Sequence, residues 1–196
     1  MLRQNEEETW QLFCKEVQGE ILTGMKSQDI KMRAKIDKWI SIFDVYSTLG
    51  VHGHILTRVS VPFISKTKLR LTIYQQDIFS EIGKFFGMQD IVIGYPEFDQ
   101  IFVIKGNNEN EIKALFENRE IPQLLLSQPN MYLEIREYKD YLEPKHSSDV
   151  DELYIHVIGA VTDIKQLRFF HLLCKKILTH LCFIGSVSED IPSIIS

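Results

Sequence analysis

Residues 88–129 constrain the fold more than any other part of the chain, because two short apolar runs, a turn and helical patterns follow one another closely there. Residues 91–93 and 101–105 have the length and composition of short strands. Glycine and proline within residues 94–98 favour a reversal of the chain between them. Asn107 or Asn108 then precedes a helical pattern as a candidate N-cap. This order of elements predicts a mixed fold with antiparallel strands.

Charge and apolar patterning narrow the class of protein. The 196 residues carry 22 Lys+Arg against 27 Asp+Glu, so the formal net charge is -5. Proteins that bind nucleic acids need a basic face to neutralise phosphates, and no nucleic-acid partner is expected. Three consecutive glutamates near the N-terminus are unlike a secretory signal. The most apolar stretch, residues 164–187, is interrupted by charged side chains and histidines, so no transmembrane segment is expected. These features predict a soluble cytoplasmic protein.

No linker rich in proline, glycine or serine divides the sequence, and no internal repeat is visible. We therefore expect a single domain over residues 1–196. Within it, residues 1–87 are expected to form a helix and a strand meander, and residues 88–196 a second set of strands with helices.

The N-terminal part changes from helical to strand spacing. An amphipathic helix is predicted over residues 6–22, with Thr23-Gly24 as its stop. Alternation of apolar and polar residues begins at Met32 and recurs up to Tyr74, which predicts a meander of about four antiparallel strands with a hairpin loop at residues 49–53. A short helix is expected to begin at Asp77.

The C-terminal part predicts further helices around two strands. Residues 108–128 are interrupted near Pro122 and predict a broken helix. Strands are expected over residues 132–138 and 152–161, with a polar loop between them. The last helix is capped by Asp163, and its apolar side chains cover more than one side, which predicts a helix wedged between layers. The predicted fold class is α+β, with antiparallel strands, helices packed on the sheet faces and a central C-terminal helix.

Four side chains of the last helix have the chemistry of zinc ligands: His171, Cys174, His180 and Cys182. His171 and Cys182 are separated by about 16 Å of helical rise, too far for one ion, so we interpret these side chains as packing residues. With Cys14, the cysteines are three in number and contain no CxxC pair, which predicts buried thiols without disulfides. No metal, cofactor or catalytic residue is predicted.

Acidic residues gather in two predicted turns. Glu97 and Asp99 flank Phe98, and a second group lies at residues 149–152. Paired carboxylates can transfer protons or bind hard cations, but in turns they commonly cap backbone N–H groups or face water. An enzyme that uses Glu97 and Asp99 with a histidine brought in by folding is therefore an alternative hypothesis.

Tyrosines near predicted strand ends and loops suggest a recognition surface, because tyrosine is enriched at such surfaces. Aromatic residues of strands are also common packing residues. Together with the two turn carboxylates, the tyrosines give a candidate ligand-binding set. Its members are Tyr95, Glu97, Asp99, Tyr132 and Tyr154.

Three blocks of the sequence share features with known proteins: FSEIGKFFGMQDI, IGYPEFDQIFVIKGNNENEIKALFENREIPQLLLSQP and VDELYIHVIGAVTDIKQLRFFHLLCKKILTHLCFIGSV. The features are the pattern PEFDxxFxIKGNxE, a broken helix ending in SQP, a DELYF-like strand and a C-terminal helix ending near IGS. On these features the chain resembles a group of uncharacterised bacterial proteins of unknown function. The resemblance covers residues 74–187 well and the N-terminal third loosely. Ile155 and His156 follow DELY, where the group often has an aromatic and a polar residue. The resemblance implies a bacterial, cytoplasmic and non-catalytic protein, and it names no active residues.

We therefore expect a non-catalytic interaction or regulatory module. Its partner would be a protein or a small ligand bound in a cleft between the sheet and the broken helix, and the chain would be a monomer or a small homo-oligomer. Reversible membrane attachment through the first helix is a third hypothesis. The acidic polar face of that helix disfavours it, because helices that lie on membranes are usually basic.

Overall fold

A computed structural model describes residues 2–22, 30–47, 53–75, 88–128, 130–138 and 149–192. The helices are α1 (Leu2–Glu16), α2 (Pro96–Asp99), α3 (Glu109–Phe116), α4 (Glu120–Ser127) and α5 (Ile164–Phe183). The strands are β1 (Glu20–Ile21), β2 (Lys31–Ile36), β3 (Trp39–Ser47), β4 (Ile55–Ile64), β5 (Leu71–Gln75), β6 (Gln89–Ile91), β7 (Phe102–Gly106), β8 (Tyr132–Glu137) and β9 (Val150–Ile158).

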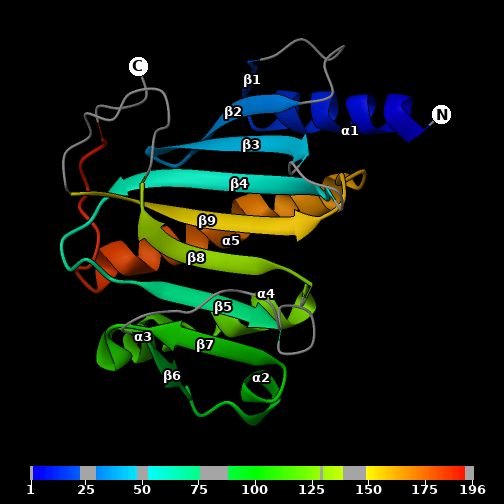
Figure 1. The fold of residues 1–196 in the computed structure, drawn as a ribbon. Helices are drawn as coiled ribbons and strands as arrows, with labels where there is room; N and C mark the ends of the chain where they lie inside the picture. The colour runs from blue at the N-terminus through cyan, green and yellow to red at the C-terminus, as the bar shows by residue number, and fades with distance from the viewer. Residues whose placement is uncertain are drawn as a thin grey trace.

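The described strands form one nine-stranded sheet in the order β1-β2-β3-β4-β9-β8-β5-β7-β6 (Figure 1). Each neighbouring pair is antiparallel. The α+β class predicted from the sequence is therefore confirmed. Strands from the two predicted parts of the chain alternate in the sheet, since β9 lies beside β4, and β5 lies between β8 and β7.

The position of β5 corrects the predicted meander. Its Leu71 is opposite Ile135 of β8 and Gly106 of β7, whereas the expected neighbour was β4. Strand β4 continues to Ile64, with one edge paired to β3 and the other paired to β9, so neither edge is left for β5. The alternation of apolar and polar residues predicted the strands of the meander, but it contained no information about which strands pair.

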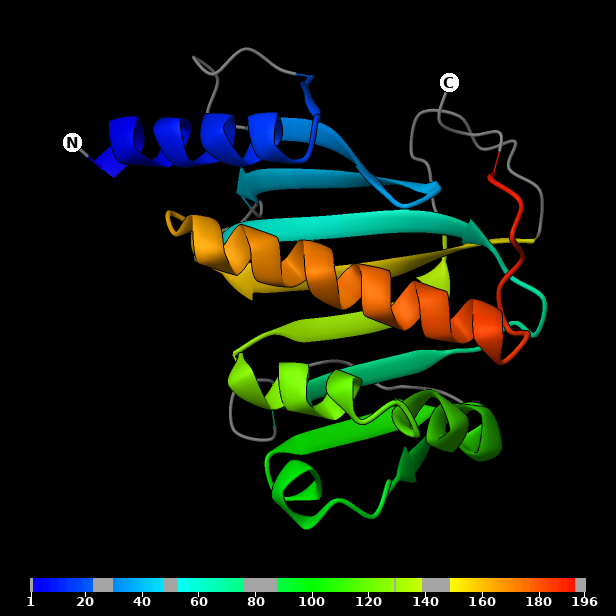
Figure 2. The same cartoon turned by 180° about the vertical axis from the view of Figure 1, so that it is seen from behind.

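One face of the sheet is apolar, and α1, α5, α4 and α3 cover it (Figure 2). Val59 and Ile155 of the two central strands are almost completely buried against this layer, as are Leu167 and Phe170 of α5. The indole Nε1 of Trp10 in α1 donates a hydrogen bond to the Val161 carbonyl at 3.0 Å. The main hydrophobic core therefore lies between the sheet and the helices.

Helix α5 begins as expected, because the Asp163 side chain accepts a hydrogen bond from the Lys165 N–H at 2.9 Å. It lies along the middle of the helix layer (Figure 2). The expected wedging between layers is not observed on its outer side, where Leu172 is 41% exposed and Phe183 is 82% exposed. Helix α5 therefore covers the sheet from one side.

The N-terminal helix ends earlier than predicted. Helix α1 stops at Glu16, and Gln18 has a left-handed backbone with φ of 51°. A Cβ at Gly19 would lie 2.7 Å from the Arg33 carbonyl oxygen, so β1 can approach β2 this closely only with glycine there. The backbone thus turns from helix to strand within residues that were assigned to the helix.

The broken helix is observed as α3 and α4. The Asn108 side chain caps α3 by accepting a hydrogen bond from the Glu111 N–H at 3.2 Å, and Pro122 lies in the first turn of α4. Strands β6 and β7 pair as expected, but one turn of helix, α2, joins them. The predicted helix at residues 77–87, most of the hairpin loop at 49–53 and the polar loop at 139–148 lie outside the described residues.

Candidate functional site

The structure separates the candidate residues into two regions. Tyr132 and Tyr154 lie on neighbouring strands of the sheet, with ring centroids 6.5 Å apart. Tyr95, Glu97 and Asp99 lie in and beside α2, which contacts β7 near the β6 edge of the sheet. Each region is therefore considered by itself.

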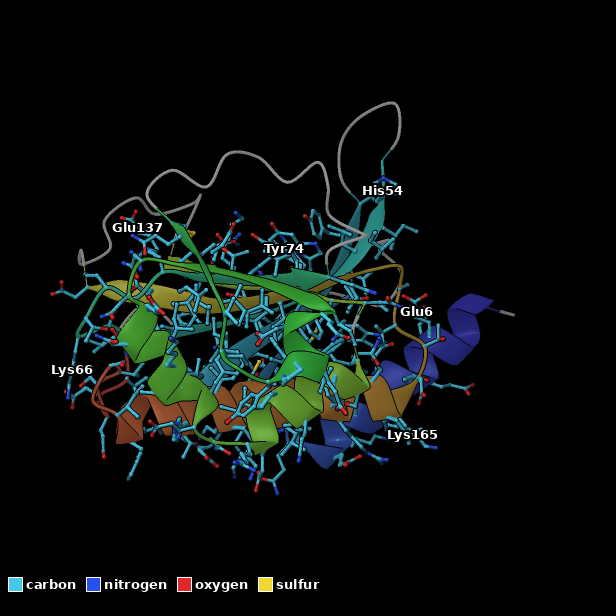
Figure 3. The ribbon with its side chains drawn as sticks, turned by 90° about the horizontal axis from the view of Figure 1, so that it is seen from below. Glu6, His54, Lys66, Tyr74, Glu137 and Lys165 are labelled. Atoms are coloured by element: carbon cyan, nitrogen blue, oxygen red, sulfur yellow. The ribbon has the colours of Figure 1, made fainter. Side chains whose placement is uncertain are left out.

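The first region is the sheet face opposite the helices, which we call the polar face. Because side chains alternate along a strand, residues next to core positions in sequence point to this face. Figure 3 shows Tyr74, which follows the buried Ile73, on the side of the sheet away from the helices. The residues considered on the polar face are Asp44, Tyr46, Arg58, Ser60, Tyr132, Glu134, Arg136, Glu152, Tyr154 and His156.

Arg58 is the cation at one side of the polar face. Its guanidinium donates two hydrogen bonds to the Asp44 carboxylate, at 2.7 and 2.6 Å. The same guanidinium lies 3.6 Å from the centroid of the Tyr46 ring. Planar bidentate pairing and stacking together are favourable for arginine, so Arg58 is fully engaged within the protein.

Arg136 has a matching environment two strands further along, on β8. It contacts Glu152 at 2.8 Å and Glu134 at 3.2 Å, and it lies 3.7 Å from the centroid of the Tyr154 ring. Ser60 donates a hydrogen bond to the second oxygen of Glu152. The two carboxylates therefore share one guanidinium, and Ser60 gives Glu152 a further hydrogen bond.

Burial holds Tyr132, Tyr154 and His156 of the polar face in their neutral forms. Burial raises the pKa of Tyr132, which also makes hydrogen bonds with Thr72 and Glu134, and burial raises the pKa of Tyr154 as well. The His156 ring stacks on Tyr132 with centroids 4.8 Å apart. Burial, and then the charges of the nearby arginines, lower the pKa of His156 to about 4. The polar face is thus an internally paired network at neutral pH.

The second region is built around α2. Asp99 accepts hydrogen bonds from the backbone N–H groups of Ile93 and Gly94, at 3.1 and 2.9 Å. Gly94 has φ of 83°, a conformation that glycine adopts without strain. Asp99 therefore fixes the turn before α2. We interpret this carboxylate as a structural group that caps backbone N–H groups.

Aromatic contacts attach α2 to the broken helix. The Tyr95 hydroxyl donates a hydrogen bond to the Phe116 carbonyl at 3.3 Å. Phe98 is fully buried and stacks on Phe102 of β7 with a centroid distance of 4.7 Å, while Phe116 meets it edge-on at 5.3 Å. These contacts hold α2 at the same end of the sheet as α4 (Figure 2).

A groove of about 410 Å³ lies between these elements, and we call it the α2–α4 groove. Its lining residues are Tyr95, Pro96, Glu97 and Phe98 on one side and Arg119, Pro122, Gln123 and Leu126 on the other. The second four are spaced i, i+3, i+4 and i+7, so they form one stripe along α4 and the residue that precedes it. This spacing was readable from the sequence, but the opposing wall was not.

The polar side chains of the groove are available to a ligand. Within the described part of the chain, no hydrogen bond or ion pair engages Glu97, Arg119 or Gln123. This distinguishes the groove from the polar face, where the charged groups are paired. Neither Asp99 nor a histidine is among the lining residues, so the constellation of the enzyme hypothesis is not assembled here.

Hollows elsewhere in the helix layer are bordered by paired cations. The hollow of about 530 Å³ between α1 and α5 contains Arg168, which is bound to Glu16 at 2.7 Å. A hollow of about 290 Å³ beside α5 contains Lys175, which is bound to Asp37 at 2.7 Å. These charges already stabilise contacts between elements.

The histidines and cysteines of α5 serve packing and backbone contacts. The Nε2 atoms of His171 and His180 lie 3.0 Å from the carbonyls of Lys35 and Ala114. Burial raises the pKa of Cys174. Among the described residues, no group of three or more histidine, cysteine, aspartate or glutamate side chains is arranged to hold a metal ion.

The acidic group at residues 149–152 is also dispersed. Asp149 lies 3.5 Å from Lys68, whereas the fully buried Asp151 accepts a hydrogen bond from Arg70 at 2.9 Å. Glu152 belongs to the polar face. These three carboxylates therefore have different partners and different environments.

No helix in the described ranges combines the length and apolar character that crossing a membrane requires. The sequence matches no protein-family model and no curated protein. Among solved structures, the chain is similar to the crystal structure of the mycobacterial trehalose monomycolate transport factor A, TtfA. That similarity covers 96% of this chain and 98% of that chain, with a TM-score of 0.56 and 7% sequence identity. At this identity the comparison shows a shared fold.

Proposed function

We propose that the protein is a non-catalytic binding module that takes its ligand in the α2–α4 groove. The observation that supports the proposal is the combination of an apolar wall with side chains that have no partner in the described protein. The partly exposed Tyr95 and Leu126 offer apolar surface, and Glu97 and Arg119 offer opposite charges. Ligand sites typically combine apolar walls with a few polar groups in this way.

The polar face is the other surface with many ionisable side chains, and its properties do not favour catalysis. It gathers more ionisable side chains than the groove, but a group that transfers protons near neutral pH needs a pKa near that pH. His156, with its pKa lowered to about 4, and the two buried tyrosines, whose pKa values are raised, are displaced from that range in opposite directions. We interpret the polar face as a structural network that keeps the sheet rigid.

The fold comparison is compatible with a role other than catalysis, since the similar protein is named a transport factor. The proposal also includes the bacterial and cytoplasmic setting that the resemblance of residues 74–187 implies. The partner is then a protein or small ligand of that compartment.

A fragment screen by NMR tests the proposed function. The protein is labelled with ¹⁵N, and fragments that bind are expected to shift the amide signals of Glu97, Gln123 and Leu126. Leu126→Gln is expected to weaken binding of these fragments about tenfold, because it removes apolar contact area from the groove. The matched control Leu172→Gln changes an exposed leucine of α5 outside the groove and should leave affinity unchanged.

Two results contradict the proposed function. Fragments that bind only outside the groove, with affinity insensitive to Leu126→Gln, would assign recognition to another surface. Turnover of a substrate by the purified protein that is lost in Glu97→Gln would instead support the enzyme hypothesis.

A further inference from the structure

The shape of the α2–α4 groove favours a chain-like ligand. Pro96, Glu97, Arg119 and Gln123 are exposed, so the groove is open to solvent along both walls. Pockets for small molecules usually enclose most of the ligand surface, and this groove cannot do so. A polypeptide segment can cross an open groove and continue beyond it at both ends.

The length of the groove matches a short extended segment. Arg119 and Leu126 are seven residues apart, which corresponds to about 10 Å along a helix axis. An extended chain rises about 3.3 Å per residue, so about three residues span this distance. The partly exposed Tyr95 and Leu126 then provide an apolar position within the span.

The charges of the groove define the flanking positions. Glu97 lies on the α2 wall and has a carboxylate that can accept hydrogen bonds, whereas Arg119 lies before α4 and has a guanidinium that can donate them. Neither side chain is engaged by the described residues. The Gln123 amide both donates and accepts, which complements a peptide group. A ligand with a basic and an acidic side chain on opposite sides of an apolar one would satisfy these groups.

We infer that the ligand of the α2–α4 groove is an extended polypeptide segment with an apolar side chain between a basic and an acidic one. This inference rests on the proposed function and specifies its ligand. The apolar side chain packs against Tyr95 and Leu126, the basic side chain pairs with Glu97, and the acidic side chain pairs with Arg119.

Synthetic peptides with blocked termini test the inference on the full-length protein. The probes are the tripeptide lysine–phenylalanine–glutamate and the reverse sequence, glutamate–phenylalanine–lysine. Both are used because the peptide can cross the groove in either direction. The comparison peptides are glutamine–phenylalanine–glutamine and lysine–glycine–glutamate. Affinity is measured from amide shifts in ¹⁵N-labelled protein at up to about 10 mM peptide, a range that reaches very weak complexes.

The charged peptide that binds more tightly of the two is expected to bind about fivefold more tightly than the glutamine peptide, because two exposed ion pairs contribute about this much affinity. It should also exceed the glycine peptide, which lacks the apolar side chain. Glu97→Gln and Arg119→Gln should each reduce the charge-dependent advantage. The control Lys113→Gln, whose lysine pairs with Glu109 on α3, should not.

Two outcomes overturn the inference. In both, failure of the inference can be told apart from failure of the proposed function. If the glutamine peptide binds as tightly as the charged ones, the groove binds apolar groups without charge recognition, and the proposed function stands. If no peptide shifts the groove amides, the ligand is not a peptide of this kind, and the fragment screen decides the proposed function by itself.

Discussion

Lowering the pH should destabilise the protein through His156. This histidine lies on the polar face with its ring stacked on Tyr132, and its register partner on β4 is Arg58. Arg136 of β8 and the Tyr154 ring, whose centroid is 5.6 Å from that of His156, also lie close to it. Protonating the ring in this environment would place a third positive charge between two arginines, and most of the surrounding water is excluded.

The sign and size of the effect follow from the pKa values. Burial first, and then the charges of Arg136 and Arg58, lower the pKa of His156 from 6.5 to about 4. Below pH 6.5 the unfolded chain therefore binds a proton that the folded protein does not bind. The stability contribution is complete above pH 6.5 and is lost as the pH falls. The loss is about 2 kcal/mol at pH 5 and reaches about 3 kcal/mol below pH 4.

Urea unfolding followed by tryptophan fluorescence measures this effect at several pH values between 7.5 and 5. Carboxylates also titrate in acid, so the informative quantity is the difference between the wild type and His156→Gln, which cannot be protonated. The variant should lose about 2 kcal/mol less than the wild type over this range. His171→Gln, outside the network, should retain the wild-type loss. Parallel curves for the wild type and His156→Gln would refute the reasoning.

Three further predictions concern stability. Arg70→Met leaves the buried Asp151 carboxylate without its cation and should cost about 3 kcal/mol in urea unfolding; a loss below about 1 kcal/mol would contradict the assigned pairing. Gly106→Ala places a Cβ against the Ile112 side chain and 3.0 Å from the Arg70 carbonyl oxygen, so the free energy of unfolding should fall by about 2 kcal/mol. An unchanged melting temperature would contradict this prediction and show that α3 can shift to make room. Asn108→Ala removes the α3 cap and should cost about 1 kcal/mol by circular dichroism melting, whereas Asn108→Asp should retain most of it.

Local elements were predictable where a single segment carries the signal. Asp163 before a long apolar stripe predicted the start of α5. Asn107 or Asn108 was predicted to cap α3, and Asn108 does so, because capping depends on neighbouring residues. Strand partners were not predictable in the same way. The alternation of β5 is the same whether its neighbour is β4 or β8. The long-range pairing of β9 with β4, which occupies the second edge of β4, decides between them.

The polar face had a partial signal in the sequence. Polar and aromatic residues recur at every second position in β8 and β9, as in Tyr132, Glu134 and Arg136, which is unusual for an outward face meant only for solvation. The register that joins these rows comes from long-range pairing, so the network itself was not foreseeable. In the same way, the α4 wall of the groove was visible as a helical stripe, but α2 was predicted only as a turn.

The central claim is that recognition occurs in the α2–α4 groove and that the polar face is structural. Calorimetric titration with the strongest fragment or peptide tests both halves in two variants. The double variant Arg119→Gln with Leu126→Gln should remain folded at the titration temperature, as its melting curve can show, and should bind about tenfold more weakly or worse. Arg58→Met, which leaves Asp44 without its cation, should melt at a lower temperature and bind the ligand as the wild type does. The reverse result, with affinity lost in Arg58→Met and retained in the groove variant, would contradict the account.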